Sequence, residues 1–101
     1  MAFVKVAKVA DVPAGTIKGF VAGEKKVAIA NAGGKFYAFE DRCSHQGARL
    51  SKGVVIGDKV MCPAHGEQFD ITTGMPAIMV AHDPIKIYAA KVEGDDILVE
   101  L

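Results

Sequence analysis

Two short segments of this chain each place a cysteine just ahead of a histidine. The first is Cys43-Ser44-His45 and the second is Cys62-Pro63-Ala64-His65. A glycine follows each histidine, at Gly47 and Gly66, where a backbone without a Cβ can wrap closely around a bulky metal centre. The two segments have the pattern of two halves of one site, so the fold must bring them together.

The residue types alone leave several kinds of site open. A single Cys is commonly a small buried residue and a single His is commonly a core or surface polar group, so neither is informative by itself. Two Cys and two His also form a familiar zinc set. Structural zinc sites, however, usually separate their paired ligands by about two to five residues, whereas a single residue separates Cys43 from His45. One intervening residue is poorly suited to chelation of a single ion by Cys43 and His45, but it allows them to bind two neighbouring iron atoms. The spacing therefore favours a binuclear cluster over zinc.

With Pro63 and both glycines, the four ligand candidates resemble the Rieske signature, in which two His replace two Cys on one iron of a [2Fe-2S] cluster. The resemblance implies that Cys43 and Cys62 hold the iron that is coordinated by sulfur alone. It also implies that His45 and His65 bind the second iron through Nδ1. Their Nε2 edges would then face solvent and form the exit for the electron.

The sequence departs from the high-potential Rieske proteins at four places. Those proteins carry an extra Cys in each loop, joined as a disulfide, and a Ser and a Tyr hydroxyl that bond to cluster sulfurs. Here Ala48 and Ala64 replace the cysteines, Glu67 replaces the Ser and Phe69 replaces the Tyr. Because the lost donors would stabilise the electron-rich reduced state, we expect a potential near the bottom of the roughly −150 to +300 mV range of Rieske centres.

From its N-terminal strand to Leu101, the chain resembles the free-standing ferredoxins of bacterial aromatic-ring-hydroxylating dioxygenase systems, including the run 62–70 and Thr73-Gly74. The resemblance implies a cytoplasmic one-electron carrier that takes electrons from an NAD(P)H-dependent flavoprotein reductase and passes them to a terminal oxygenase. No catalysis of its own is expected, because the sequence has no nucleophile–base pair and no Gly-rich nucleotide motif. The alternatives are a permanent small subunit of a larger oxidoreductase, such as nitrite reductase, and a zinc-stabilised interaction module.

Other residues of the same region have weaker assignments. The run from Met75 to Ile78 resembles a loop that covers the other side of the cluster, although it would also suit an ordinary turn followed by apolar residues. His82 precedes Asp83-Pro84 and is expected to be a solvated side chain without a role. The residues that flank the ligand loops either help to form a docking surface or are simple rim residues: Gln46, Arg49 and Glu67.

The fold is predicted to be all-β, in stacked antiparallel sheets, because short apolar runs alternate with turn residues about every 8–12 positions. The expected strands are Phe3–Ala7, Thr16–Val21, Lys26–Asn31, Lys35–Glu40, Gly53–Ile56, Lys59–Cys62, Gln68–Asp70, Ile85–Val92 and Asp96–Leu101. Turn chemistry favours hairpins at Gly23-Glu24, Ala32-Gly33-Gly34, Gly57-Asp58 and Gly94-Asp95. In the last pair, Ile85, Ile87 and Ala89 are expected on a buried face with Ile97, Val99 and Leu101.

The 101 residues suit one domain, 1–101. The Rieske resemblance implies a base of about residues 1–40 and 71–101, with a cluster-binding part of about 41–70 inserted in it. Twelve basic residues balance twelve acidic ones, so nucleic acid is not expected as a partner. No apolar stretch approaches the roughly 20 residues of a membrane helix, so no membrane association is expected either.

Overall fold

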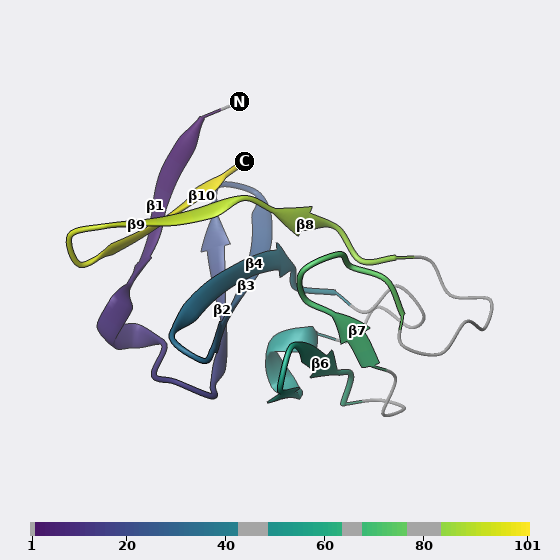
Figure 1. Cartoon of the computed structure of the whole chain (residues 1–101). Coiled ribbons are helices and arrows are strands. Elements are labelled where there is room, and N and C mark those ends of the chain that lie inside the picture. The colour runs from purple at the N-terminus through teal and green to yellow at the C-terminus, as the bar shows by residue number, and fades with distance from the viewer. Residues whose placement is uncertain (1, 43–48, 64–67, 77–83) are drawn as a thin grey trace.

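The computed structural model describes residues 2–42, 49–63, 68–76 and 84–101 and arranges them in three antiparallel sheets (Figure 1). Sheet A has the order β1 (Phe3–Lys8), β10 (Asp96–Glu100) and β9 (Ala90–Glu93). Sheet B has the order β2 (Ile17–Ala22), β3 (Lys25–Ala32), β4 (Lys35–Glu40) and β8 (Ile87–Tyr88). Sheet C has the order β5 (Val54–Ile56), β6 (Lys59–Met61) and β7 (Gln68–Asp70). The all-β prediction is therefore confirmed.

Two single-turn 3-10 helices complete the described structure, η1 (Val9–Asp11) and η2 (Leu50–Lys52). Within the described ranges no helix is long and apolar enough to cross a membrane.

Sheet B is the middle layer of the molecule. Side chains alternate between the two faces of a strand, and on β3 one set, Ala28 and Ala30, joins the core cluster shared with sheet C. The other set, Val27 and Ile29, joins the cluster shared with sheet A. Both faces are covered, and so β3 is buried continuously from Val27 to Asn31 instead of at every second residue.

The four predicted hairpins are confirmed. Antiparallel pairing joins β2 to β3, β3 to β4, β5 to β6 and β9 to β10. The glycines between these strands have positive φ, for example +64° at Gly23 and +60° at Gly57, a region that other residues rarely adopt.

The predicted strand Ile85–Val92 is wrong as a single element. The chain forms β8, which pairs with β4 in sheet B, and then β9, which pairs with β10 in sheet A. Ala89 lies at the crossing between the two sheets and is exposed, contrary to the expected alternation, whereas Ile85, Ile97 and Val99 are buried as predicted. The alternation of apolar and polar residues along a strand does not indicate a change of partner sheet, so this break could not be predicted from the sequence.

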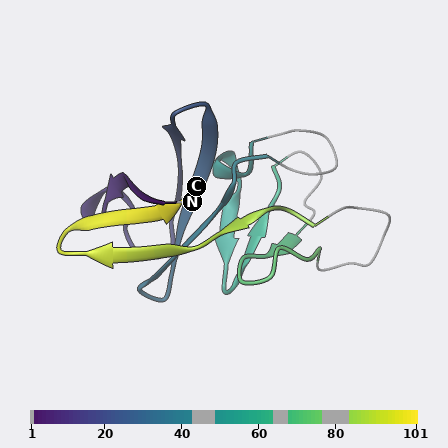
Figure 2. The same cartoon turned by 90° about the horizontal axis from the view of Figure 1, so that it is seen from above.

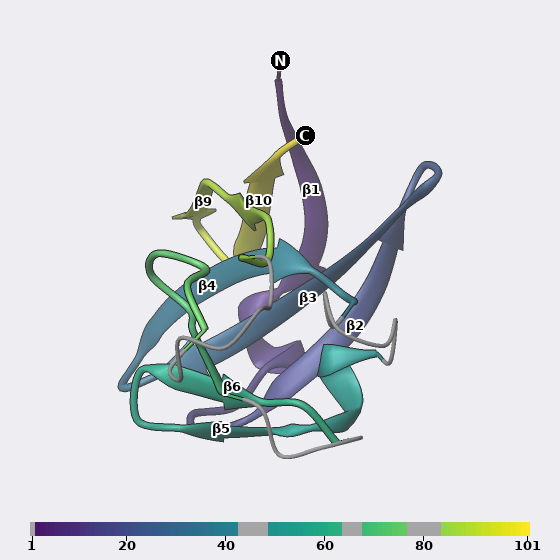
Figure 3. The ribbon, with the colours of Figure 1, turned by 90° about the vertical axis from the view of Figure 1, so that its right-hand side faces the viewer.

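Sheets A and C lie at opposite ends of the molecule, with sheet B between them (Figure 2). In sheet A the amide of Leu101 donates a hydrogen bond to the carbonyl oxygen of Ala2 at 3.2 Å, so both ends of the described chain are fixed in this sheet. Figure 3 shows the other end, where β5 and β6 run side by side. Cys62, the described cysteine of the second cysteine–histidine segment, lies at that end, because β6 leads directly into it.

Candidate metal centre

The structure describes one of the four predicted ligands, Cys62. Cys43, His45 and His65 lie outside the described residues, as do the predicted flanking and loop residues Gln46, Gly47, Ala48, Ala64, Gly66, Glu67, Ala77, Ile78 and His82. The site is therefore described from Cys62 and from the residues that lead into and out of these segments.

Cys62 follows the last residue of β6 and is almost completely buried, with 1% of its surface exposed. It packs in the cluster between sheets B and C, together with Leu50 and Phe69. Leu50 is the first residue of η2, directly after Arg49, and Phe69 is the middle residue of β7. One apolar cluster thus joins Cys62 to the chain that leaves segment 43–48 and to the strand that follows segment 64–67.

Antiparallel pairing also fixes the two ends of segment 64–67. Met61 on β6 lies opposite Gln68 on β7, and Val60 lies opposite Phe69. The second predicted ligand segment therefore connects two neighbouring strands of sheet C. Sheet C provides a rigid support for Cys62, which sits at the point where β6 ends.

A tight turn after β7 leads back toward the same region. The amide of Asp70 donates to the carbonyl oxygen of Met75 at 2.8 Å, and Phe69 forms an isolated bridge with Pro76. Pro76 is buried, whereas Met75 is 42% exposed. The run Met75 to Ile78, predicted to cover the site, therefore begins beside Phe69, although its last two residues lie outside the described chain.

The Asp70 carboxylate organises this turn. Its Oδ1 accepts hydrogen bonds from the hydroxyl and the amide of Thr72, the latter at 2.8 Å. The Thr72 hydroxyl bond is the largest cause that lowers the pKa of Asp70 below its usual value, followed by the bond from the Thr72 amide. Asp70 therefore stays ionised and holds the turn closed at neutral pH.

An ion pair closes the base of segment 43–48. Asp41 follows β4 and its side chain is completely buried, while Arg49 lies at the other end of the segment. Asp41 Oδ2 accepts bonds from Arg49 Nε at 3.1 Å and from Arg49 Nη2 at 2.9 Å. The Ser51 hydroxyl donates to the same oxygen and the Ser51 amide donates to Oδ1, both at 2.7 Å. The sequence gives no signal for Asp41, and Arg49 was predicted to be either a docking-surface residue or a simple rim residue, because nothing in the local pattern pairs the two.

Gly19 on β2 provides the space for this ion pair. A Cβ at residue 19 would lie 2.6 Å from Asp41 Oδ2, 2.7 Å from Ser51 Oγ and 2.9 Å from Arg49 Nη2. These separations are shorter than carbon–oxygen and carbon–nitrogen contacts allow, so any side chain here would displace the ion pair.

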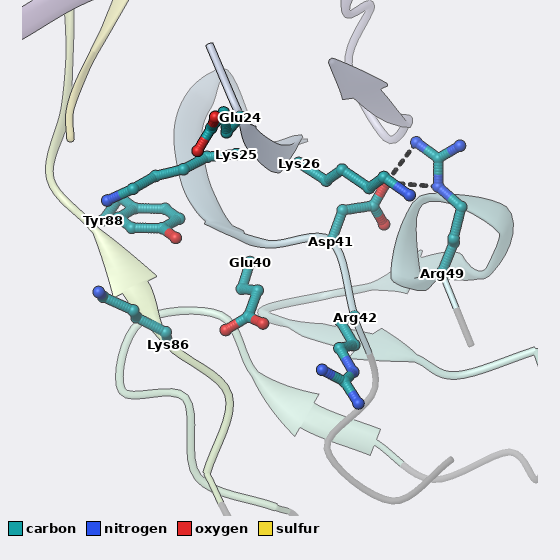
Figure 4. A pocket seen from close by; sticks show the side chains of 9 residues that line it. All are labelled: Glu24, Lys25, Lys26, Glu40, Asp41, Arg42, Arg49, Lys86 and Tyr88. Carbon is teal, nitrogen blue, oxygen red and sulfur yellow. Dashed lines mark hydrogen bonds and ion pairs between the residues drawn. The ribbon is translucent and has the colours of Figure 1, made fainter. Parts of the chain in front are cut away.

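A charged pocket of about 580 Å³ lies beside the ion pair (Figure 4). Its lining residues are Glu24, Lys25, Lys26, Glu40, Asp41, Arg42, Arg49, Lys86 and Tyr88. The ammonium groups of Lys25 and Lys86 lie 5.8 and 5.5 Å from the centre of the Tyr88 ring. Burial raises the pKa of the Tyr88 phenol, and the nearby Glu40 carboxylate raises it further, so the phenol is neutral at physiological pH.

The described part of the site is compatible with a cluster ligand at Cys62. A thiolate is a ligand that iron–sulfur clusters require. Cys62 follows the end of a paired strand and is buried among apolar side chains, and solvent exclusion is one of the factors that set the potential of such centres. Among the described residues, no group of three or more His, Cys, Asp or Glu side chains forms another candidate for a metal.

Comparison with known proteins agrees with this description. The Rieske [2Fe-2S] domain family matches residues 2–89. The ferredoxin component of biphenyl 2,3-dioxygenase from Rhodococcus jostii (strain RHA1) is 36% identical over 101 residues, which is 100% of this chain and 94% of the relative.

Two solved structures are also similar. The ferredoxin of carbazole 1,9a-dioxygenase from Nocardioides aromaticivorans IC177 superposes with a TM-score of 0.89 at 31% identity, over 98% of this chain and 97% of that one. A ferredoxin in a complex of reduced oxygenase and oxidized ferredoxin in carbazole 1,9a-dioxygenase has a TM-score of 0.86 at 36% identity, over 96% of this chain and 91% of that one.

Proposed function

Because the chain belongs to the Rieske [2Fe-2S] domain family, we propose that it is a ferredoxin that carries single electrons from a flavoprotein reductase to a terminal oxygenase. The observation that carries the proposal is the buried position of Cys62 at the end of β6, inside a fold that matches dioxygenase ferredoxins along almost its whole length. One Rieske-type cluster is the cofactor, and it supplies the site that accepts and releases the electron.

Four side chains are proposed as the cluster ligands: Cys43, His45, Cys62 and His65. Sheet C and the segments that it supports would then form the cluster-binding part, about 41–70, with sheets A and B as the base. Two ferric ions, two sulfides and two thiolates sum to zero charge, so reduction creates a single negative charge. Neutral imidazole ligands therefore make the electron easier to accept than four thiolates would.

The acceptor is proposed to be the terminal oxygenase of an aromatic-ring-hydroxylating system, and the site of action the cytoplasm. Support comes from the relatives, one of which is the ferredoxin component of a biphenyl dioxygenase and another of which forms a complex with its oxygenase. A carrier that meets two partners in turn needs weak, short-lived complexes, whose interfaces are typically below about 1,200 Å².

The first experiment is analysis of iron and acid-labile sulfide, together with the visible spectrum and the electron paramagnetic resonance spectrum after reduction with dithionite. We expect two irons and two sulfides per chain, a brown protein that bleaches on reduction, and a reduced signal with a low average g-value. A colourless protein with one zinc would overturn the proposed function and the ligand assignment together.

Histidine variants test the ligand assignment, because the chain provides its own control. His45→Gln and His65→Gln should each lose the Rieske resonance signal, since the second iron loses a ligand. The third histidine has no assigned role, so His82→Gln should retain the full signal and the same iron content. Loss of the signal in His82→Gln, or its retention in His65→Gln, would contradict the assignment.

Electron delivery is tested by anaerobic mixing with NADH and an NADH-dependent flavoprotein reductase of an aromatic-ring-hydroxylating dioxygenase system as a probe. The protein should bleach only when the reductase is present, and subsequent mixing with the oxidised oxygenase of that system should restore its colour. Bleaching by NADH alone would contradict a carrier that depends on a flavoprotein.

A further inference from the structure

We propose that the ion pair between Asp41 and Arg49 is a positioning element for the metal centre, which holds the two ends of segment 43–48 together while adding no net charge beside it. The inference rests on the proposed function, because Cys43 and His45 lie within the segment that the pair closes. It concerns two side chains that are not themselves ligands.

The position of the pair supports a role beyond general stability. Asp41 is completely buried, whereas Arg49 retains 42% of its side-chain exposure, so the pair reaches from the core to the surface. Removing a carboxylate from water has a large cost, which the attraction of a partner often only balances. The four donors on Asp41 offset that cost, and they all come from Arg49 and Ser51, on the far side of the segment. The same set of bonds therefore fixes where the segment starts and where it ends.

The surrounding chain is arranged for the pair. The amide of Asp41 donates to the carbonyl oxygen of Lys26 at 3.0 Å, which attaches the residue to β3. On the other side of the segment, η2 packs against β2 and β3. Gly19 on β2 lies beside the pair, and the absence of a Cβ there leaves room for the polar groups of Asp41, Ser51 and Arg49. Both ends of the segment are thus fixed to sheet B, while Cys62 is fixed to sheet C.

The pair also controls charge close to the proposed ligands. Asp41 lies two residues before Cys43 and Arg49 lies four residues after His45. At about 3.5 Å per residue, these positions are within about 7 and about 14 Å of the ligand residues along the chain. The buried charge of Asp41 is screened only partly by salt at such a distance, whereas the exposed charge of Arg49 is screened more strongly. Intact, the pair contributes no net charge. If either partner is lost, the other remains as an uncompensated charge.

Three variants test this role. Asp41→Asn leaves the Arg49 charge, which should stabilise the reduced centre and raise the potential. Arg49→Gln leaves the Asp41 charge, which should lower the potential. The double variant Asp41→Asn with Arg49→Gln is neutral again and should return toward the wild-type potential. Potentials are measured on the loaded protein at pH 8, in low and high salt, and both single shifts should shrink in high salt.

Cluster retention reports the positioning role separately. We expect all three variants to lose the visible spectrum about tenfold faster than the wild type when an iron chelator is added, since the bonds that hold the two ends of the segment together are lost or weakened; tenfold in rate corresponds to about 1.4 kcal/mol. Arg49→Lys keeps the charge but has one donor group in place of the fork, so its potential should match the wild type while its cluster is lost faster. Circular dichroism verifies that each variant is folded.

The matched control is the ion pair of Lys5 and Asp96, which spans 3.4 Å between β1 and β10 in sheet A. Lys5→Gln and Asp96→Asn should change neither the potential nor the rate of cluster loss. If Asp41→Asn does not fold, Arg49→Gln and Arg49→Lys still carry the comparison, because the carboxylate keeps both Ser51 donors.

Shifts of the potential with the same sign in Asp41→Asn and Arg49→Gln, or rates of cluster loss equal to the control, would overturn the inference. A wild-type protein without iron and sulfide would instead overturn the proposed function, which the first metal analysis reveals before any variant is made.

Discussion

The amide of Ile85 donates a hydrogen bond to the carbonyl oxygen of Gly74 at 2.9 Å, and a Cβ on Gly74 would overlap the carbonyl oxygen of Ile85. The bond joins the chain on either side of segment 77–83 and fixes the start of the run that leads into β8. Gly74 also has a φ of +83°, so its backbone conformation and its close contact both require glycine.

Gly74→Ala should therefore destabilise the protein more than a positive φ alone explains. The control is Gly15→Ala, because Gly15 has a similar φ of +79° and a Cβ added there would meet no atom within 4 Å. Alanine at a left-handed position costs about 1–2 kcal/mol, and the overlap with Ile85 should add roughly 1–3 kcal/mol at Gly74. Urea unfolding of the two variants measures the difference, and equal losses would show that the contact with Ile85 relaxes at no cost.

Phe69→Tyr should raise the reduction potential. Phe69 is completely buried in the cluster that contains Cys62, and high-potential Rieske proteins have a Tyr at the corresponding place, with its hydroxyl bonded to a cluster sulfur. The net contribution of a hydrogen bond is about 0.5–1.5 kcal/mol, which corresponds to a shift on the order of 20–60 mV for one electron.

The control for that substitution is Phe36→Tyr, since Phe36 packs against the other core cluster, on the sheet A side of β4. Its potential should equal that of the wild type in protein-film voltammetry. An equal shift of the potential in both variants would show that the effect comes from added polarity and not from a hydrogen bond made by the hydroxyl at residue 69.

Asp70 should stabilise the fold only above acidic pH. Its pKa is lowered in the folded protein, first by the hydroxyl of Thr72, so its contribution is fully present above the unfolded value of about 3.8 and is lost as the pH falls through the folded pKa. The difference in melting temperature between the wild type and Asp70→Asn should be largest near pH 6 and shrink as the pH falls below about 3.8. Thr72→Val should weaken this pH dependence while the carboxylate is retained, because it removes the largest cause of the lowered pKa and keeps the backbone hydrogen bonds. A constant difference across the range would show that Asp70 acts only by its shape.

The reduction potential should be independent of pH around neutrality. If His45 and His65 hold the second iron through Nδ1, as we propose, each would keep a single proton in both redox states, and no proton would accompany the electron. Voltammetry between pH 6 and 8 should give a flat line. A slope of about 59 mV per pH unit would show proton-coupled reduction instead.

Local chemistry determined most of the strands and all of the described hairpins. At Gly23, Gly57 and Gly94 the residue type itself permits the positive φ of a tight turn, and the apolar alternation of Ile97 and Val99 specifies which face of β10 is buried. The Cys-His spacing favoured a binuclear cluster over zinc, and the resemblance of the two segments to the Rieske signature predicted which cluster it is.

Only the tertiary structure decided which distant segments meet. Residues 85–92 have a single apolar–polar alternation but belong to two sheets, because β8 pairs with β4 and β9 pairs with β10. Asp41 and Arg49 form a pair because β4 ends where η2 begins and because β2 places a glycine beside them. Such contacts depend on packing between elements that are far apart in the chain. The free energy of a buried charge likewise depends on the hydrogen-bond donors that the folded chain places around it. The sequence by itself therefore predicted the ligands and specified most of the strands, and the packing of the three sheets decided how the ends of the proposed ligand segments are held.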